Sequence, residues 1–218
     1  MSIVVEHDKR RKQILKKALD VFMEEGFEDT TYQKIADRCK ITRTTLYLYF
    51  RNRQEIFNFS IKQFMAEVEQ DILGVKDNKT LSCSSKLKKI MFLILTRLEE
   101  NRLLISVILN YLLSKSTEAG KLKSDIPLEG KSAYGNTGTP SLSYNLVRRR
   151  TIRHRRILSA MLFEGIKTGQ LRKIDVGAAN DLLFSIIESA IFRLAVLKRE
   201  STTDLKAAAE LAINELCS

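Results

Sequence analysis

Apolar residues recur at helical spacing through most of the chain, and polar breaks divide the pattern into successive helices. In residues 9–25, Ile14, Leu15, Leu19 and Phe22 fall on one face, and Gly26 follows as a C-terminal cap. The same spacing predicts further helices at about 30–39, 42–50, 52–74, 86–100, 103–114, 146–168, 175–199 and 203–216. No segment alternates with the two-residue period of a strand, so the sequence predicts an all-α protein.

Polar residues between these segments predict where helices begin and where the chain is irregular. Thr30 with Gln33 has the spacing of a capping box for the second helix, and Thr42 can cap the third. Asn52 with Glu55 predicts the start of the long fourth helix. Residues 121–145 contain both prolines, three glycines and many Ser, Thr and Asn residues. We therefore expect a long, mobile loop there.

The second and third segments have the pattern of a helix-turn-helix. Such a pair needs apolar residues that fix the turn and a small residue where the two helices touch. Ile35, Cys39, Ile41 and Leu46 meet the first need, and Ala36 meets the second. The first helix would cover the back of the pair. A simple three-helix bundle is the alternative, but it does not explain the small residue, the turn and the polar outer face together.

The outer face of the third helix carries side chains suited to a DNA major groove. With Leu46 pointing to the core, helical geometry turns Thr44 and Leu48 outward, and Arg43 lies at the edge. Arginine can pair with guanine, and an apolar side chain can contact the thymine methyl group. Tyr47 and Arg53 are better placed for phosphates. The predicted DNA-binding residues are Thr31, Thr42, Arg43, Thr44, Thr45, Tyr47, Leu48 and Arg53.

Residues 10–57 resemble the N-terminal domain of the TetR family of bacterial transcriptional regulators. The matching residues are Gly26, Phe27, Thr30, Thr31, Ile35, Ala36, Ile41, Thr42, Leu46, Tyr47, Phe50 and Arg53. A weaker similarity covers residues 164–166 and 169–171. Two positions depart from the family pattern. Lys40 stands where the turn usually has glycine, and Thr44 stands where a small residue is preferred. A non-glycine residue in a left-handed turn costs roughly 1 kcal/mol, which a packed unit tolerates.

The resemblance implies two domains: a DNA-binding domain at residues 1–52 and a helical ligand-binding and dimerisation domain at 53–218. The segment 175–199 is apolar around much of its circumference, which indicates burial on more than one side. A homodimer contact would explain this pattern, and so would a central core helix in a monomer. The residues expected at the dimer interface are Ile157, Met161, Leu183, Ile187, Ile191 and Leu194.

The resemblance also implies a cavity for a small-molecule inducer between these regions. The candidate lining residues are Phe64, Met65, Met91, Leu95, Arg97, Asn110, Tyr111 and Phe163. Ordinary core packing is the alternative for the apolar ones, because Met and aromatic residues at helical spacing usually pack against each other. Arg97 and Asn110 would orient a ligand or be solvated.

The net charge of +11 favours an anionic partner, but the excess is concentrated away from the predicted DNA reader. Residues 121–156 hold nine basic and two acidic side chains. Within them, the run from Arg148 to Arg156 is the strongest local anomaly. It fits either a solvated helix face or a site for an acidic ligand, a polyanion or a membrane surface.

The composition argues against catalysis. His7 and His154 are the only histidines, and neither has a partner at the spacing of a triad or a metal site. We expect no enzyme activity, no cofactor and no metal. Three scattered cysteines, no signal peptide and no apolar run of transmembrane length predict a cytoplasmic protein.

These features together predict a sequence-specific transcriptional regulator that binds a palindromic operator in double-stranded DNA as a homodimer. Repression relieved by an inducer is the expected mode, although activation stays open. The alternative is a nucleoid-associated or division-control protein on the same fold that lacks an inducer. Operator specificity distinguishes the two.

Overall fold

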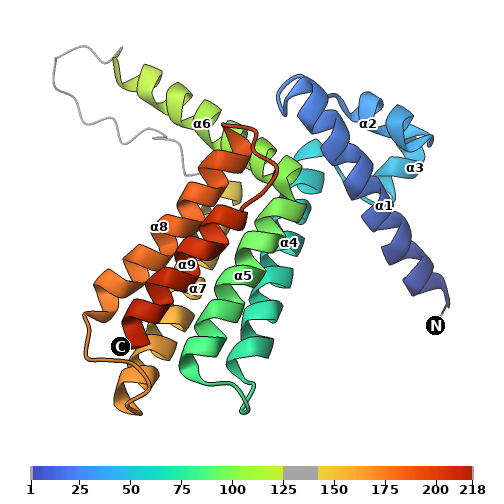
Figure 1. Ribbon diagram of the computed structural model, residues 1–218. Coiled ribbons are helices and arrows are strands. Elements are labelled where there is room, and N and C mark those ends of the chain that lie inside the picture. The colour runs from blue at the N-terminus through green and yellow to red at the C-terminus, as the bar shows by residue number, and fades with distance from the viewer. Residues whose placement is uncertain (1, 125–141, 218) are drawn as a thin grey trace, which may run out of the picture. The chain divides into compact units, whose positions relative to one another are not determined.

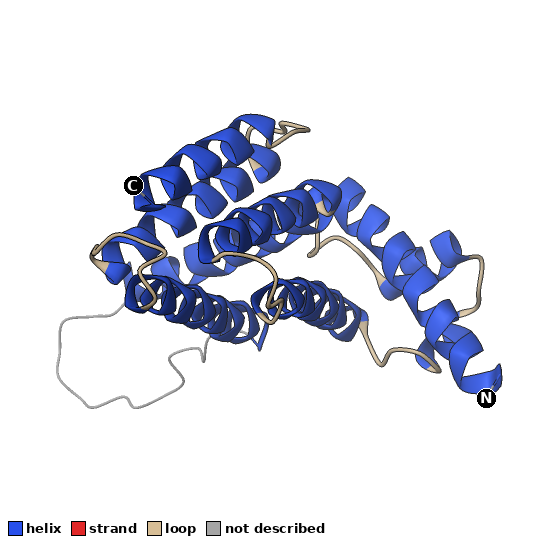
Figure 2. Ribbon diagram, turned by 60° about the horizontal axis from the view of Figure 1, so that its bottom comes forward, coloured by secondary structure: helices blue, strands red, loops and turns tan. Residues whose placement is uncertain are grey.

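The structure, a computed structural model, describes residues 2–124 and 142–217, and all secondary structure in these ranges is helical (Figure 2). This confirms the predicted all-α class. The helices are α1 (Ser2–Glu25), α2 (Tyr32–Cys39), α3 (Arg43–Tyr47), α4 (Arg53–Lys76), α5 (Cys83–Glu100), α6 (Arg102–Ser124), α7 (Leu142–Lys167), α8 (Val176–Ala195) and α9 (Thr203–Cys217).

The helices on either side extend into the loop expected at residues 121–145. Helix α6 continues to Ser124, beyond the predicted end near residue 114, and α7 begins at Leu142. Residues 125–141, the rest of the expected loop, lie outside the described part of the chain. Polar residues in these helix ends resemble loop composition, which is why the periodicity was lost there.

The chain divides into two compact units, and the first consists of Met1–Ile61 with Ser106–Leu146. Ala18 and Phe22 of α1 pack in its core with Ile35 of α2 and Leu46 of α3, and all four are essentially inaccessible to solvent. This division differs from the expected boundary after residue 52, because the start of α4 belongs to this unit. Phe57 of α4 contacts Phe22, with ring centroids 5.9 Å apart.

Thr31, rather than the predicted Thr30, caps the N-terminus of α2. The Thr31 hydroxyl accepts a hydrogen bond from the Lys34 amide at 3.2 Å. Thr30 is fully buried, and its hydroxyl donates to the Gly26 carbonyl at 2.6 Å. The two threonines have the same side chain, which can cap a helix. What distinguishes the cap, Thr31, from Thr30 is that Thr30 is buried. Thr42 caps α3 as predicted, accepting from the Thr45 amide at 3.0 Å.

The second unit consists of Lys62–Ile105 and Val147–Ser218. Within it, α5 packs against α8 and α9, and α8 lies beside α9 (Figure 1). Leu87, Ile90 and Met91 of α5 and Leu183 of α8 are fully buried. Burying an aliphatic side chain of this size contributes about 1.5–3 kcal/mol, so these contacts define the core of the unit.

Gly165 on α7 permits a close approach between three segments of the second unit. A Cβ atom at this position would lie 2.6 Å from Cys83 Sγ and 2.6 Å from Leu171 Cδ1. Gly169 ends the helix with a φ of +70°, and the Leu171 amide then donates to the Gly165 carbonyl at 3.0 Å. Close packing therefore explains the glycine at 165, and the left-handed backbone explains the glycine at 169.

None of the helices within residues 2–124 and 142–217 combines the length and apolar character needed to cross a bilayer. Over the same ranges, His, Cys, Asp and Glu side chains form no group of three that could hold a metal ion.

Candidate functional site

The turn between α2 and α3 has the geometry that a helix-turn-helix requires. Lys40 adopts the left-handed conformation, with φ 56° and ψ 46°. The Ile41 amide donates to the Ala36 carbonyl at 3.1 Å, which closes the end of α2. Ala36 itself is fully buried, as a small residue at the contact between the helices should be. The turn thus forms in spite of lysine at the usual glycine position.

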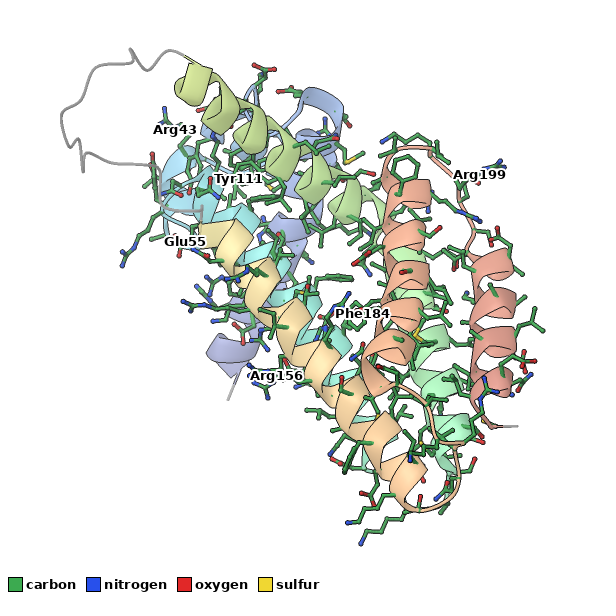
Figure 3. The ribbon with its side chains drawn as sticks, turned by 90° about the vertical axis from the view of Figure 1, so that its left-hand side faces the viewer. Arg43, Glu55, Tyr111, Arg156, Phe184 and Arg199 are labelled. Carbon is green, nitrogen blue, oxygen red and sulfur yellow. The ribbon has the colours of Figure 1, made fainter. Side chains whose placement is uncertain are left out.

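Helix α3 buries one side and exposes the other. Leu46 is fully buried, whereas Tyr47 is 50 % and Leu48 73 % exposed. Arg43, which is labelled in Figure 3, and Thr44 are also exposed. An exposed leucine beside arginine and threonine gives this surface hydrogen-bonding groups and an apolar group side by side.

Tyr32 of α2 supports this surface from behind, and the sequence did not single it out. Its hydroxyl donates to the Phe50 carbonyl, and its ring centroid lies 4.7 Å from that of Tyr47. Desolvation raises the pKa of Tyr32 to about 12, so the phenol keeps its proton and remains a donor. Tyr47 in turn accepts from Arg43 Nη2 at 3.4 Å. The aromatic pair therefore orients the exposed arginine.

The predicted DNA-binding threonines use their hydroxyls partly within the protein. Thr31 and Thr42 are the caps of α2 and α3. The Thr45 hydroxyl lies 2.9 Å from that of Thr42. Thr44 is the predicted threonine whose exposed side chain lies on the open side of α3.

Arg53 occupies a different place from the expected phosphate contact. Its Nη1 donates to the carbonyls of Phe27 at 2.9 Å, Thr30 at 2.6 Å and Glu28. Its guanidinium also lies 4.9 Å from the Phe27 ring centroid and pairs with the Glu28 carboxylate at 3.3 Å. Arg53 therefore fastens the start of α4 to the loop between α1 and α2. Sequence spacing could not reveal this, because the acceptors are main-chain atoms.

Helix α1 contacts the rest of the first unit through ion pairs and one half-buried arginine. Arg38 and Lys34 of α2 pair with Glu24 and Glu25 of α1. The hydrogen bond from Arg38 lowers the pKa of Glu24. Arg11 lies over the rings of Phe50 and Phe59, 4.8 and 4.0 Å from their centroids. Both basic residues of α2 are therefore paired with acidic residues of α1. Arg43 is the basic residue of α3.

Comparison with known proteins agrees with this geometry. Residues 14–58 match the family described as bacterial regulatory proteins, tetR family. Over 184 residues, the chain is 25 % identical to the fatty acid metabolism regulator protein of Bacillus subtilis (strain 168). That alignment covers 82 % of this chain and 80 % of the relative. The N-terminal domain of the chain is a DNA-binding domain of the TetR family.

Solved structures show the same fold. The chain matches the fatty acid degradation regulator FadR from Bacillus halodurans with a TM-score of 0.63 and 19 % identity, covering 96 % of this chain and 95 % of that one. It matches AibR, solved in complex with isovaleryl coenzyme A and operator DNA, with a TM-score of 0.63 and 15 % identity over 92 % and 96 % of the two chains. The protein is a DNA-binding transcription regulator related to fatty acid metabolism regulators, and its relatives are not enzymes.

The expected ligand residues are divided between the two units of the chain. Phe64, Met91 and Leu95 are buried in the second unit, and Met65 there is half-buried. Tyr111 belongs to the first unit, where it packs against Phe27 and Phe57. The three remaining candidates have other surroundings: Arg97 pairs with Asp71 at 2.7 Å, Asn110 is exposed, and Phe163 is 64 % exposed.

Most of the expected dimer residues are buried within the protomer itself. Met161, Leu183, Ile187 and Leu194 are buried, and Ile157 and Ile191 are half-buried. The apolar side chains that these helices expose are Ile152 and Phe163 on α7 and Leu182 and Phe192 on α8, with Val196 just after it. The wide apolar stripe indicated two buried sides, but periodicity alone could not tell which side faces the protomer's own core.

The basic run on α7 is only partly a solvated face. Arg150 and Arg153 pair with the buried Glu69 of α4. Arg155 pairs with Asp181 and lies 4.3 Å from the ring centroid of Phe184, which Figure 3 labels on α8. The exposed arginines of the run are Arg148, Arg149, Arg153 and Arg156. The run therefore holds α7 against α4 and α8, and a sequence count of charges could not identify these partners.

Proposed function

We propose that this regulator is a homodimeric repressor that binds a palindromic operator and releases it when an acyl-coenzyme A binds. The observation that carries the proposal is the exposed face of α3, with Arg43, Thr44 and Leu48 held outward by the buried Leu46. A bidentate arginine and an apolar contact to a thymine methyl group can each discriminate between base pairs.

Dimerisation supplies the affinity that one short helix lacks. Two copies related by a twofold axis place their recognition helices in successive major grooves, about one helical turn of DNA apart. The exposed side of α8 supports such a contact, because Leu182, Ser185, Ser189 and Phe192 fall within one stripe at helical spacing, and none carries a charge. Phe163 and Ile152 of α7 add further exposed apolar surface. Large exposed apolar side chains such as Leu182 and Phe192 on one helix face favour a protein contact.

Similarity to the Bacillus subtilis fatty acid metabolism regulator protein supports an acyl ligand. AibR, which shares the fold, was solved with isovaleryl coenzyme A. In this chain, Phe64, Met91 and Leu95 are buried apolar residues of the second unit, which is the kind of side chain that an acyl chain would contact. A ligand can shift the regulator only through different affinities for its operator-bound and released arrangements.

The test is fluorescence anisotropy with DNA from upstream of the regulator's own gene, in a salt series and with competitor DNA. We expect tight binding that resists competitor and falls when palmitoyl-coenzyme A is added. Arg43→Ala should cost about 1–3 kcal/mol and relax base preference at one position of each half-site. Lys62→Ala, at an exposed position of α4 in the second unit, is the matched control and should leave the affinity unchanged.

Weak binding that is equal on all sequences would contradict a specific repressor and favour the architectural alternative. Tight binding that palmitoyl-coenzyme A leaves unchanged would support specific operator binding and contradict release by an acyl-coenzyme A.

A further inference from the structure

A buried polar cluster joins α4 to α7 within the second unit. It consists of Glu69 on α4 and Arg150, Arg153 and His154 on α7, and we call it the Glu69 cluster. Arg153 Nη2 lies 2.8 Å from Glu69 Oε1, and Arg150 Nη1 pairs with Oε2 of the same carboxylate. Glu69 is buried, and His154 is only 7 % exposed. The surrounding positions of α4, Val68 and Ile72, are buried and apolar.

One polar atom of the cluster is unsatisfied. His154 Nε2 is buried without a hydrogen-bond partner among the described residues. Buried side-chain polar atoms nearly always have a partner, so such an atom marks a place for a group that the protein does not itself supply. Burial lowers the pKa of His154, Arg150 and Arg153 lower it further, and Glu69 opposes them. The neutral ring can then donate to or accept from a polar ligand.

The charges of the cluster favour an anion. Two guanidinium groups face one carboxylate, and a guanidinium binds a carboxylate or a phosphate with similar bidentate geometry. Arg153 is 60 % exposed, so an anion can approach from solvent. A buried ion pair is weak support for stability, because desolvation offsets the attraction between its charges. Glu69 therefore occupies the two guanidinium groups that an anion would otherwise bind.

We propose that the Glu69 cluster binds the anionic head group of an acyl ligand, which replaces Glu69 on Arg150 and Arg153 and so frees α4 from α7. The proposal rests on the ligand-controlled repressor described above, and it specifies the ligand's charge and the contact that the ligand breaks. Helix α4 is continuous, and its residues 53–61 belong to the unit that carries α3. Loss of the Glu69 pairs therefore acts on a helix shared with the DNA-binding unit.

Calorimetric titration of the free protein tests the exchange without DNA. The probes are decanoate, decanoyl-coenzyme A, coenzyme A and the uncharged decanol. Glu69→Gln removes the internal competitor, and we expect it to tighten binding of the anionic amphiphile by about tenfold, a usual size for coupled equilibria. Arg153→Gln, at an exposed side chain, should weaken binding. Glu210→Gln is the matched control, because its pair with Lys88 joins α9 to α5 on the surface.

Tighter binding to Glu69→Gln and weaker binding to Arg153→Gln supports the proposal, and the preferred probe then identifies the head group as carboxylate or phosphate. A merely structural Glu69 predicts the opposite sign, with weaker or equal binding to Glu69→Gln, and this would overturn the proposal. Decanol bound as tightly as decanoate would also overturn it. Operator release is measured in parallel. If binding follows the expected pattern but operator affinity does not change, the cluster proposal stands and the ligand-controlled repressor fails.

Discussion

Replacing Arg53 distinguishes a structural role from a contact to DNA. In the structure its guanidinium donates to the carbonyls of Phe27, Glu28 and Thr30, and Arg53→Gln would remove these bonds. A hydrogen bond from a charged group contributes about 1.5–3 kcal/mol when it is well buried. The Arg53 side chain is 32 % exposed, so water can replace part of the loss. We therefore expect a total loss of roughly 2 kcal/mol, well below the sum for three fully buried bonds.

For a chain of this size, such a loss lowers the thermal midpoint by about 4–8 °C. Differential scanning calorimetry measures it, with Arg51→Gln as the matched control, because Arg51 is exposed and surface substitutions usually change stability by under about 0.5 kcal/mol. The salt dependence of operator binding should be unchanged in Arg53→Gln. An unchanged midpoint together with a salt slope reduced by about one would refute the structural role, because that slope change corresponds to one lost phosphate contact.

Three further predictions follow from single positions. Lys40→Gly should raise the thermal midpoint by about 2–4 °C, because the left-handed backbone costs a non-glycine residue roughly 1 kcal/mol. Lys40→Ala removes the same charge without relieving the strain, so equal midpoints for the two variants would contradict the argument. Phe192→Glu should convert the dimer to a monomer in light scattering, whereas Leu211→Glu, exposed on α9, should not; a dimeric Phe192→Glu would exclude the α8 stripe. Stability should fall as the pH drops below the ordinary histidine pKa of 6.5, since burial in the Glu69 cluster lowers the folded-state pKa of His154 and the unfolded chain takes up the proton first. His154→Gln should flatten this part of the urea-unfolding profile, and an equally steep profile would assign the dependence to other groups.

The helix-turn-helix and the exposed side of α3 could be predicted because they depend on local order along the chain. Ala36, the turn at Lys40 and the inward Leu46 occur within one short stretch, and helical geometry alone decides which neighbours point outward. The threonine cap of α2 was misplaced by one residue, since Thr30 and Thr31 have the same capping group and differ only in burial.

The dimer and ligand residues could not be predicted to the same depth. Leu183 and Leu182 are adjacent and equally apolar, yet the first is fully buried and the second is largely exposed. Their roles depend on which neighbouring helices cover α8, and periodicity carries no information about the neighbours. Tyr111 is an aromatic residue of the kind expected to line a ligand cavity, but it packs in the aromatic core of the first unit.

The sequence by itself determined the helical class, the helix-turn-helix, the outward face of α3 and the TetR family, because each follows from residues within a few helical turns of one another. Only the tertiary structure decided that Arg53 binds main-chain carbonyls, that Arg150 and Arg153 share the buried Glu69, and which side of α8 remains open. These pairings join residues distant in the chain, and the energy of a charge depends on its partner and its burial rather than on its place in the sequence.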